Sequence, residues 1–146
     1  MEESLTLLDL IKRDFGLGEV ELKTLSPLTL AFVGDCIYDL ILRTVIVERH
    51  NASPNRLHRE KSRMAKAPAQ AEMAEALKRY LTKEELAVYR RGRNAKSHTT
   101  AKNASVLDYR KATGLEALYG WLYLSGQEER MLELIRLSLD ELGWKL

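Results

Sequence analysis

Residues 26–43 read SPLTLAFVGDCIYDLILR, and this stretch decides the predicted fold. Ser26 and Pro27 form a helix start signal, because serine caps a first turn and proline is tolerated at the first helical position. The apolar run that follows predicts one long helix that ends near Glu48. The residues with the spacing of a core-facing stripe are Leu30, Val33, Ile37, Leu40, Ile41 and Thr44.

The other apolar segments also have helical spacing, and none shows a convincing strand period, so we expect an all-α fold. The remaining expected helices cover residues 5–14, 54–67, 68–81, 83–93, 106–124 and 128–143. The expected caps are Ser4, Ser53 with Pro54, Thr82 with Glu85, and Ser105. Residues 93–105 are polar and lack an apolar period, which predicts one long loop with a functional role.

The composition is that of a globular protein, with 45% hydrophobic and 30% charged residues in a chain of 146. This length suits a single domain that spans residues 1–146. Cys36 is the only cysteine, so no internal disulfide can form and a reducing, cytoplasmic location is expected. No stretch is long and apolar enough for a membrane span, and the acidic start is unlike a signal peptide, so we expect no membrane contact.

Positive charge is concentrated in two segments, although the net charge is only +2. Residues 56–66 are rich in lysine and arginine and contain one acid, and residues 90–102 are basic with none. This distribution predicts one basic surface that could bind nucleic acid. Two solvated helix faces explain the charge alone equally well.

Two carboxylates occupy the long apolar helix, Asp35 and Asp39, at a spacing that places them one turn apart. Like charges at this spacing repel, and a hard divalent cation such as Mg²⁺ or Mn²⁺ would remove that cost. For Asp39 the favoured interpretation is instead an ion pair with Arg43, four residues on. Asp35 has no cation three or four residues away, so it is the better candidate ligand.

A third acid, Glu116, lies in another apolar helix. Gly120 lies one turn after it, and Gly34 lies beside Asp35, so either glycine could let a second backbone approach closely. Two such helices could cross with one acid from each and form a metal seat. The alternative is that Glu116 is an ordinary solvated acid, which is the usual state of a helical glutamate.

Three sequence runs carry a family resemblance. LAFVGDCIYDLILR, residues 30–43, resembles the signature helix of ribonuclease III, and ATGLEALYGWLYL, residues 112–124, resembles its second acidic helix. The run RGRNAKSHTTAKNASVLDYRKATGLEALYGWLYL, with no double-stranded-RNA-binding domain in the chain, is similar to the short bacterial branch, Mini-ribonuclease III. The resemblance covers essentially the whole chain.

This resemblance implies the ribonuclease III endonuclease fold and a Mg²⁺-dependent cleavage of double-stranded RNA, with Mn²⁺ as a substitute. Asp35 and Glu116 match the metal-binding acids of the family. Long ribonuclease III chains carry further acids where this chain has Leu28, Ala31 and Thr113, a reduction that Mini-ribonuclease III shares. Water, RNA phosphate and the candidate outer-shell residue Asp39 would complete the coordination.

The resemblance also implies a homodimer whose paired sites cut both strands and leave 5′-phosphates with two-nucleotide 3′ overhangs. The residues expected at the dimer interface are Leu28, Phe32 and Cys36. The expected RNA-binding residues are Arg56, Arg59, Lys61 and Arg63 on one helix, and Arg91, Arg93, Asn94, Lys96, Ser97 and Lys102 in the loop.

The implied substrate is the precursor of large-subunit (23S) ribosomal RNA, with a large-subunit ribosomal protein as helper. The competing interpretation is a catalytically silent ribonuclease III-like domain that binds structured RNA as a scaffold. A silent domain would have no reason to retain both Asp35 and Glu116, so the sequence favours the enzyme.

Overall fold

The computed structural model describes residues 4–96 and 105–146, and its regular elements in these ranges are helices. They are α1 (Leu7–Asp14), α2 (Pro27–Arg49), α3 (Pro54–Ala65), α4 (Ala67–Leu77), α5 (Lys83–Asn94), α6 (Val106–Leu124) and α7 (Glu128–Leu142), with 3₁₀ turns η1 (Leu22–Thr24) and η2 (Lys78–Tyr80). The all-α prediction is confirmed. None of the described helices could cross a membrane.

Capping side chains account for where the helices begin. The Ser26 hydroxyl accepts a hydrogen bond from the backbone N–H of Thr29 at 3.1 Å, as the serine–proline signal predicts. Ser53 and Ser105 cap α3 and α6 in the same way. The first helix differs from the prediction, because Thr6 caps it in place of Ser4 and forms a reciprocal capping box with the N3 residue.

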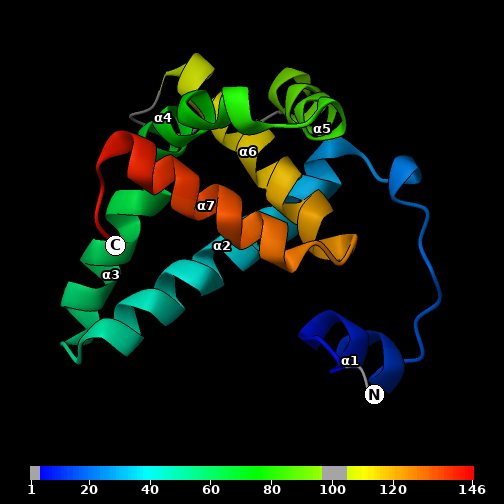
Figure 1. The fold of residues 1–146 in the computed structure, drawn as a ribbon, viewed down its shortest axis with the longest axis horizontal. Coiled ribbons are helices and arrows are strands. Elements are labelled where there is room, and N and C mark those ends of the chain that lie inside the picture. The colour runs from blue at the N-terminus through cyan, green and yellow to red at the C-terminus, as the bar shows by residue number, and fades with distance from the viewer. Residues whose placement is uncertain (1–3, 97–104) are drawn as a thin grey trace.

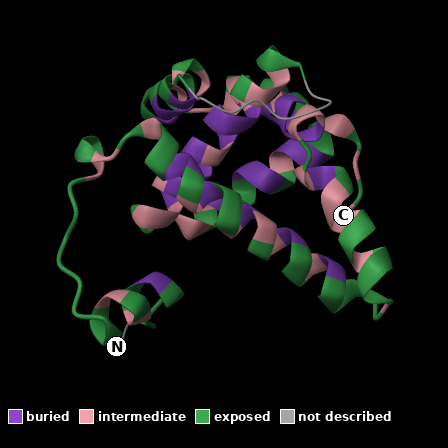
Figure 2. Ribbon diagram, turned by 180° about the vertical axis from the view of Figure 1, so that it is seen from behind, coloured by how far each residue is buried: buried purple, intermediate pink, exposed green. Residues whose placement is uncertain are grey.

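Helix α6 lies at the centre of the body, where it packs against α2, α4, α5 and α7 (Figure 1). Leu115, Leu118, Tyr119 and Leu122 of this helix are almost completely buried. Figure 2 shows the buried residues gathered along α6 and its neighbours, whereas α1 is mostly exposed. Residues of α6 are therefore held on several sides, and a side chain on this helix has a well-defined position.

Helices α2 and α6 touch backbone to backbone. A Cβ atom added to Gly34 would lie 1.7 Å from the carbonyl oxygen of Glu116, and one added to Gly120 would lie 1.9 Å from the carbonyl oxygen of Leu30. No larger residue fits at either position without separating the helices. The predicted crossing of the two glycine-bearing helices is confirmed.

The predicted core stripe of α2 is confirmed at Leu30, which is buried, and at Ile37 and Ile41, which pack against the core, but it is wrong at two positions. Leu40 and Thr44, which the stripe includes, are exposed. The buried residues of α2 are Leu30, Ala31, Gly34, Tyr38, Leu42 and Ile46. Because α6 packs against the face that contains Gly34, the buried stripe is centred on Gly34 and Tyr38, and a second apolar face remains at the surface.

Candidate active site

The α2–α6 crossing brings Asp35 and Glu116 together. Asp35 is exposed and Glu116 is half-buried, and their carboxyl groups are joined by a hydrogen bond. Burial, followed by this hydrogen bond and the negative charge of Asp35, raises the pKa of Glu116 to about 9. The close approach of the two carboxyl groups therefore favours one shared proton when no cation is bound.

This pair suits a hard divalent cation. Carboxylate oxygens are preferred ligands of Mg²⁺ and Mn²⁺, and a cation between the two groups would replace the shared proton and cancel their repulsion. Within residues 4–96 and 105–146, no cluster of three or more acidic, histidine or cysteine side chains is placed to hold a metal. A cation held by Asp35 and Glu116 would thus keep positions open for water and for a substrate phosphate.

Two stacked tyrosines hold the helices in register beside the acids. Tyr38 follows Asp35 by three residues and Tyr119 follows Glu116 by three, and their rings stack with centroids 5.4 Å apart. The Tyr38 hydroxyl donates a hydrogen bond to the Met64 carbonyl at 2.9 Å, which ties the stack to α3. Sequence reasoning missed this support, although the repeated spacing of acid and tyrosine in both helices was a usable signal.

Asp39 has a different environment from Asp35. Its carboxylate is 2.6 Å from Arg43 Nε and 3.1 Å from Lys61 Nζ of α3. Burial raises the pKa of Asp39, but the hydrogen bonds and charges of Arg43 and Lys61 outweigh it and hold the pKa below its usual value. The predicted pair with Arg43 is confirmed, and an outer-shell role for Asp39 stays a prediction.

Comparison with known proteins identifies the family. A family model described as Ribonuclease III domain matches residues 28–127. Curated relatives named Mini-ribonuclease 3 are 41% identical in Clostridium tetani (88% of this chain, 88% of the relative), 49% in a Thermoanaerobacter species (80% and 82%) and 47% in Enterococcus faecalis (83% and 93%). The chain belongs to the Mini-ribonuclease 3 family.

A solved structure supports the fold as well. The crystal structure of a protein from Fusobacterium nucleatum is similar with a TM-score of 0.76 at 26% identity, over 84% of this chain and 98% of that one. Asp35 and Glu116 both lie within the residues that match the Ribonuclease III domain. The acid pair is thus part of the shared domain of this Mini-ribonuclease 3 family member.

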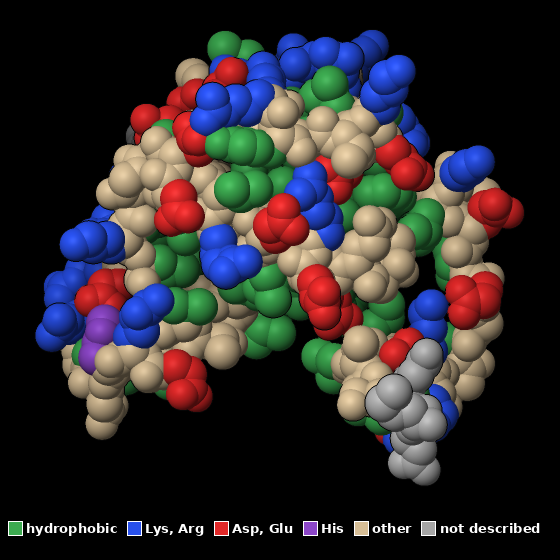
Figure 3. Space-filling view, in the orientation of Figure 1, with side chains coloured by type: hydrophobic (Ala, Val, Ile, Leu, Met, Phe, Trp, Pro, Cys, Tyr) green, Lys and Arg blue, Asp and Glu red, His purple; other side chains and the backbone are tan. Residues whose placement is uncertain are grey.

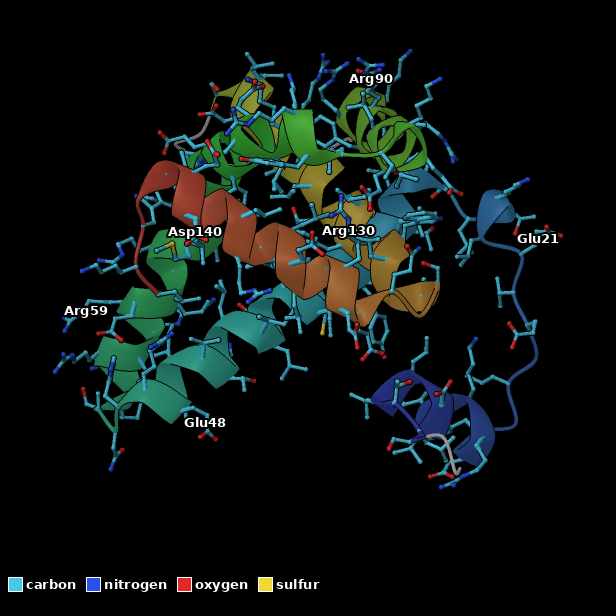
Figure 4. All side chains as sticks on the ribbon, in the orientation of Figure 1. Glu21, Glu48, Arg59, Arg90, Arg130 and Asp140 are labelled. Carbon is cyan, nitrogen blue, oxygen red and sulfur yellow. The ribbon has the colours of Figure 1, made fainter. Side chains whose placement is uncertain are left out.

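The basic residues expected to bind RNA lie on two elements. Arg56, Arg59 and Arg63 are exposed on α3, and Figure 3 shows the positive charge over α3 and over α5. In Figure 4, Arg59 and Arg90 point outward from these two helices. Lys61 differs, because its side chain is only 15% exposed and its ammonium group is paired with Asp39. Its position on α3 ties that helix to α2.

The expected RNA-binding loop is shorter than predicted. Arg91, Arg93 and Asn94 belong to α5, since this helix ends at Asn94 and residue Ala95 leaves it. The Arg93 guanidinium lies over the Tyr89 ring, 5.9 Å from its centroid, so part of the predicted loop is an ordered helix end. Lys96 is exposed just after the helix. Ser97 and Lys102 lie outside the described residues.

The expected dimer-interface residues share one exposed face of α2. Leu28 is 39% exposed and Phe32 is 80% exposed, and Cys36 is also at the surface. Leu40 continues the same face by one further turn. We call Leu28, Phe32, Cys36 and Leu40 the α2 stripe. This apolar face of the Mini-ribonuclease 3 domain is available for a partner, and the homodimer itself stays a prediction.

Proposed function

We propose that this chain is a Mg²⁺-dependent endoribonuclease that cleaves double-stranded RNA. The observation that carries the proposal is the Asp35–Glu116 pair at the glycine-lined crossing of α2 and α6. A carboxyl group with a strongly raised pKa beside a second acid is a common property of catalytic sites. The pair lies inside the part of the chain that matches the Ribonuclease III domain, which supports the nuclease assignment.

Each acid has a distinct task in this proposal. Asp35 is exposed and presents a carboxylate toward solvent and substrate, whereas Glu116 is held by α6 and loses its proton when the cation binds. When bound, the cation supplies a water molecule of lowered pKa and offsets negative charge at the scissile phosphate. Hydrolysis in this sense leaves a 5′-phosphate on one product and a 3′-hydroxyl on the other. Mn²⁺ could replace Mg²⁺ because both prefer oxygen ligands.

We propose that the protein recognises double-stranded RNA by the shape of its sugar–phosphate backbone. The minor groove of A-form RNA is wide and shallow, so phosphates and 2′-hydroxyls are its main accessible features. Arg56, Arg59 and Arg63 of α3 and the basic end of α5 with Lys96 offer charges for these phosphates. We assign Lys61 chiefly to holding α3 against α2, since contact with RNA would require it to leave Asp39.

Cleavage of both strands requires two active sites, so we propose a homodimer. A two-fold axis that passes through the α2 stripe would pair the stripe with its own copy. Leu28, Phe32 and Cys36 are exposed there and supply the apolar contact. Each protomer would then cut one strand and leave a two-nucleotide 3′ overhang.

For the physiological substrate we propose the large-subunit (23S) ribosomal RNA precursor in the bacterial cytoplasm. A large-subunit ribosomal protein is the proposed helper, because the chain has no separate RNA-binding domain among its described elements and its affinity for RNA should depend strongly on salt. The lone cysteine and the lack of a membrane-spanning helix among the described residues fit this location.

The deciding experiment is incubation of purified protein with long double-stranded RNA, with Mg²⁺ and then with excess EDTA. We expect shortened products that carry 5′-phosphates only when the metal is present. The variants Asp35→Asn and Glu116→Gln should bind the RNA and leave it intact. RNA binding without cleavage by the unmodified protein, with the helper protein also supplied, would support the scaffold interpretation and contradict the enzyme.

A further inference from the structure

The N-terminal arm, residues 4–24, carries a large share of the exposed apolar surface. It contains α1 and η1 and joins the body just before Ser26, the cap of α2. The exposed large hydrophobic residues of the arm are Leu5, Leu7, Ile11, Phe15, Leu17 and Val20. Phe15 is 77% exposed, which is unusual for a phenylalanine in a free surface segment.

The arm is ordered but barely attached to the body. Helix α1 packs closely against none of the other described helices, and no arm residue belongs to either hydrophobic core. Figure 1 shows α1 standing apart from the other helices, and the space-filling view in Figure 3 shows a hollow beside it. Its own contacts hold its shape, including the Thr6 capping box and an ion pair between Lys12 and Glu19 at 3.5 Å.

A complementary surface lies between α2 and α7. These helices and the C-terminal residues border a groove of about 1130 Å³. Its apolar lining includes Ile41 and Val45 of α2, Leu132 and Leu139 of α7, and Trp144. Leu132 is 45% exposed, so the groove has apolar wall in contact with solvent. The same groove also has charged residues in its walls, which are Arg49, Glu129, Glu133, Arg136, Asp140 and Lys145. The protein thus presents an unpartnered amphipathic helix and an open groove with mixed apolar and charged walls on the same chain.

We propose that the arm of one protomer packs into the α2–α7 groove of a second copy, so that the homodimer exchanges its N-terminal arms. This inference rests on the homodimer of the proposed function. In this arrangement the arm and the groove belong to the same interface as the α2 stripe. The two arm–groove contacts of the dimer would lie on either side of the contact between the two stripes.

The position of the arm on α2 favours a second copy as its partner. A two-fold axis through Phe32, at right angles to α2, sets the two α2 helices antiparallel. Ser26, six residues before the axis, then faces residue 38 of the partner, only three residues from the groove-lining Ile41. The link over residues 15–24 can span up to roughly 33 Å when extended, at about 3.3 Å per residue. The arm can therefore reach the partner's groove.

The surface area that a stable dimer must bury also favours a second copy as the partner of the arm. Even a large aromatic side chain buries only about 150–250 Å², so Leu28, Phe32 and Cys36 alone fall short of the roughly 800 Å² per partner of a standard interface. In an exchanged dimer, each of the two arms would add its six exposed apolar residues to the interface, a surface comparable to that of the α2 residues. Arm exchange would bring the interface into the range of specific, stable complexes.

The arm and one wall of the groove lie outside the residues that match the Ribonuclease III domain. The Ribonuclease III match begins at residue 28, after the arm, and ends at residue 127, before α7. The acid pair and the α2 stripe lie inside it. The proposed contact therefore joins residues from the two ends of the chain, outside the matched range, to α2 inside it.

The first test is sedimentation velocity over a concentration series, with the full chain and with a variant that lacks residues 1–24. We expect the dimer dissociation constant to rise at least tenfold in the shortened variant, while its thermal unfolding changes little because Leu25 and the Ser26 cap remain. Phe15→Ser should weaken the dimer in the same direction. Glu21→Ser is the matched control, since Glu21 extends into solvent from the same arm (Figure 4) and should leave the dimer unchanged.

The second test locates the arm by cross-linking. In a Cys36→Ser background, Ile11→Cys combined with Leu132→Cys should form a disulfide-linked dimer on mild oxidation, and Glu21→Cys combined with Leu132→Cys should not. An Ile11–Leu132 pair that closes within one chain, or that stays reduced in a stable dimer, would overturn the arm exchange and leave the proposed nuclease intact. A full chain that is monomeric yet cleaves RNA would refute both the dimer and the exchange, and not the active site.

Discussion

Asp35 and Asp39 lie one turn apart on α2, yet their surroundings give them opposite properties. At Asp35 the neighbouring helix α6 supplies another acid, and the pKa of that acid, Glu116, rises to about 9. At Asp39 the neighbouring helix α3 supplies Lys61, which together with Arg43 lowers the pKa of the carboxylate. The comparison teaches that the helix packed beside an acid decides whether it becomes a site for a cation or part of a salt bridge.

The largest expected effect is on cleavage activity, and it distinguishes Asp35 from Asp39. Asp35→Asn and Glu116→Gln should each lower single-turnover cleavage of double-stranded RNA by at least about a thousandfold, because either change removes a metal ligand. Asp39→Asn should lower it by less than about tenfold, since Asp39 serves α3 in this structure. Equal losses in all three variants would show that Asp39 also acts at the metal.

The crossing itself should be sensitive to a single methyl group. Gly34→Ala and Gly120→Ala each place a Cβ within 2 Å of a backbone carbonyl oxygen, so we expect a loss of roughly 3 kcal/mol or more in the free energy of unfolding. Gly18→Ala is the matched control, because nothing lies within 4 Å of its added Cβ. Urea unfolding monitored by circular dichroism measures all three, and unchanged stability of Gly34→Ala would contradict the close contact.

Glu116 and Asp39 should make the stability of the metal-free protein depend on pH in opposite directions. The raised pKa of Glu116 means that its favourable contribution is complete below its ordinary pKa of 4.5 and is lost as the pH rises toward about 9. The lowered pKa of Asp39 means that its contribution is present above its ordinary pKa of 3.8 and is lost as the pH falls through the lowered value.

Urea unfolding in EDTA at about pH 5, 7 and 9 tests the first of these expectations. The stability of the unmodified protein should fall across this range more steeply than that of Glu116→Gln, which cannot ionise at that position. Added Mg²⁺ should raise the free energy of unfolding most at high pH. Glu116 is less protonated there, so the cation displaces fewer protons when it binds. Parallel pH profiles for the two proteins would show that Glu116 is not the titrating group.

The smallest effects concern the basic helix α3. Arg59→Ala should reduce the slope of log affinity for RNA against log salt concentration by about one, as expected for one lost phosphate contact. Lys61→Ala should change this slope less and instead lower stability by about 0.5–1 kcal/mol, because it breaks a partly exposed ion pair. Filter binding over a salt series distinguishes the two, and a full unit of slope lost with Lys61→Ala would assign that residue to RNA.

Much of the fold could be predicted from local signals. Serine caps followed by proline placed the starts of α2 and α3 correctly, because capping depends on side chains next to the helix. The buried face of α2 was predicted only in part, since α2 is apolar on two faces and its periodicity does not say which one meets α6. Likewise, no local pattern indicates that Lys61 of α3 pairs with Asp39.

The sequence by itself determined the helices, the glycines beside two acids and the resemblance that points to a nuclease, because these depend on short-range patterns along one chain. Only the tertiary structure decided how strongly Glu116 is desolvated beside Asp35, that Lys61 pairs with Asp39, and that the N-terminal arm is left exposed. The physical reason is that desolvation and charge interactions depend on distance in space, and only packing of the helices sets those distances.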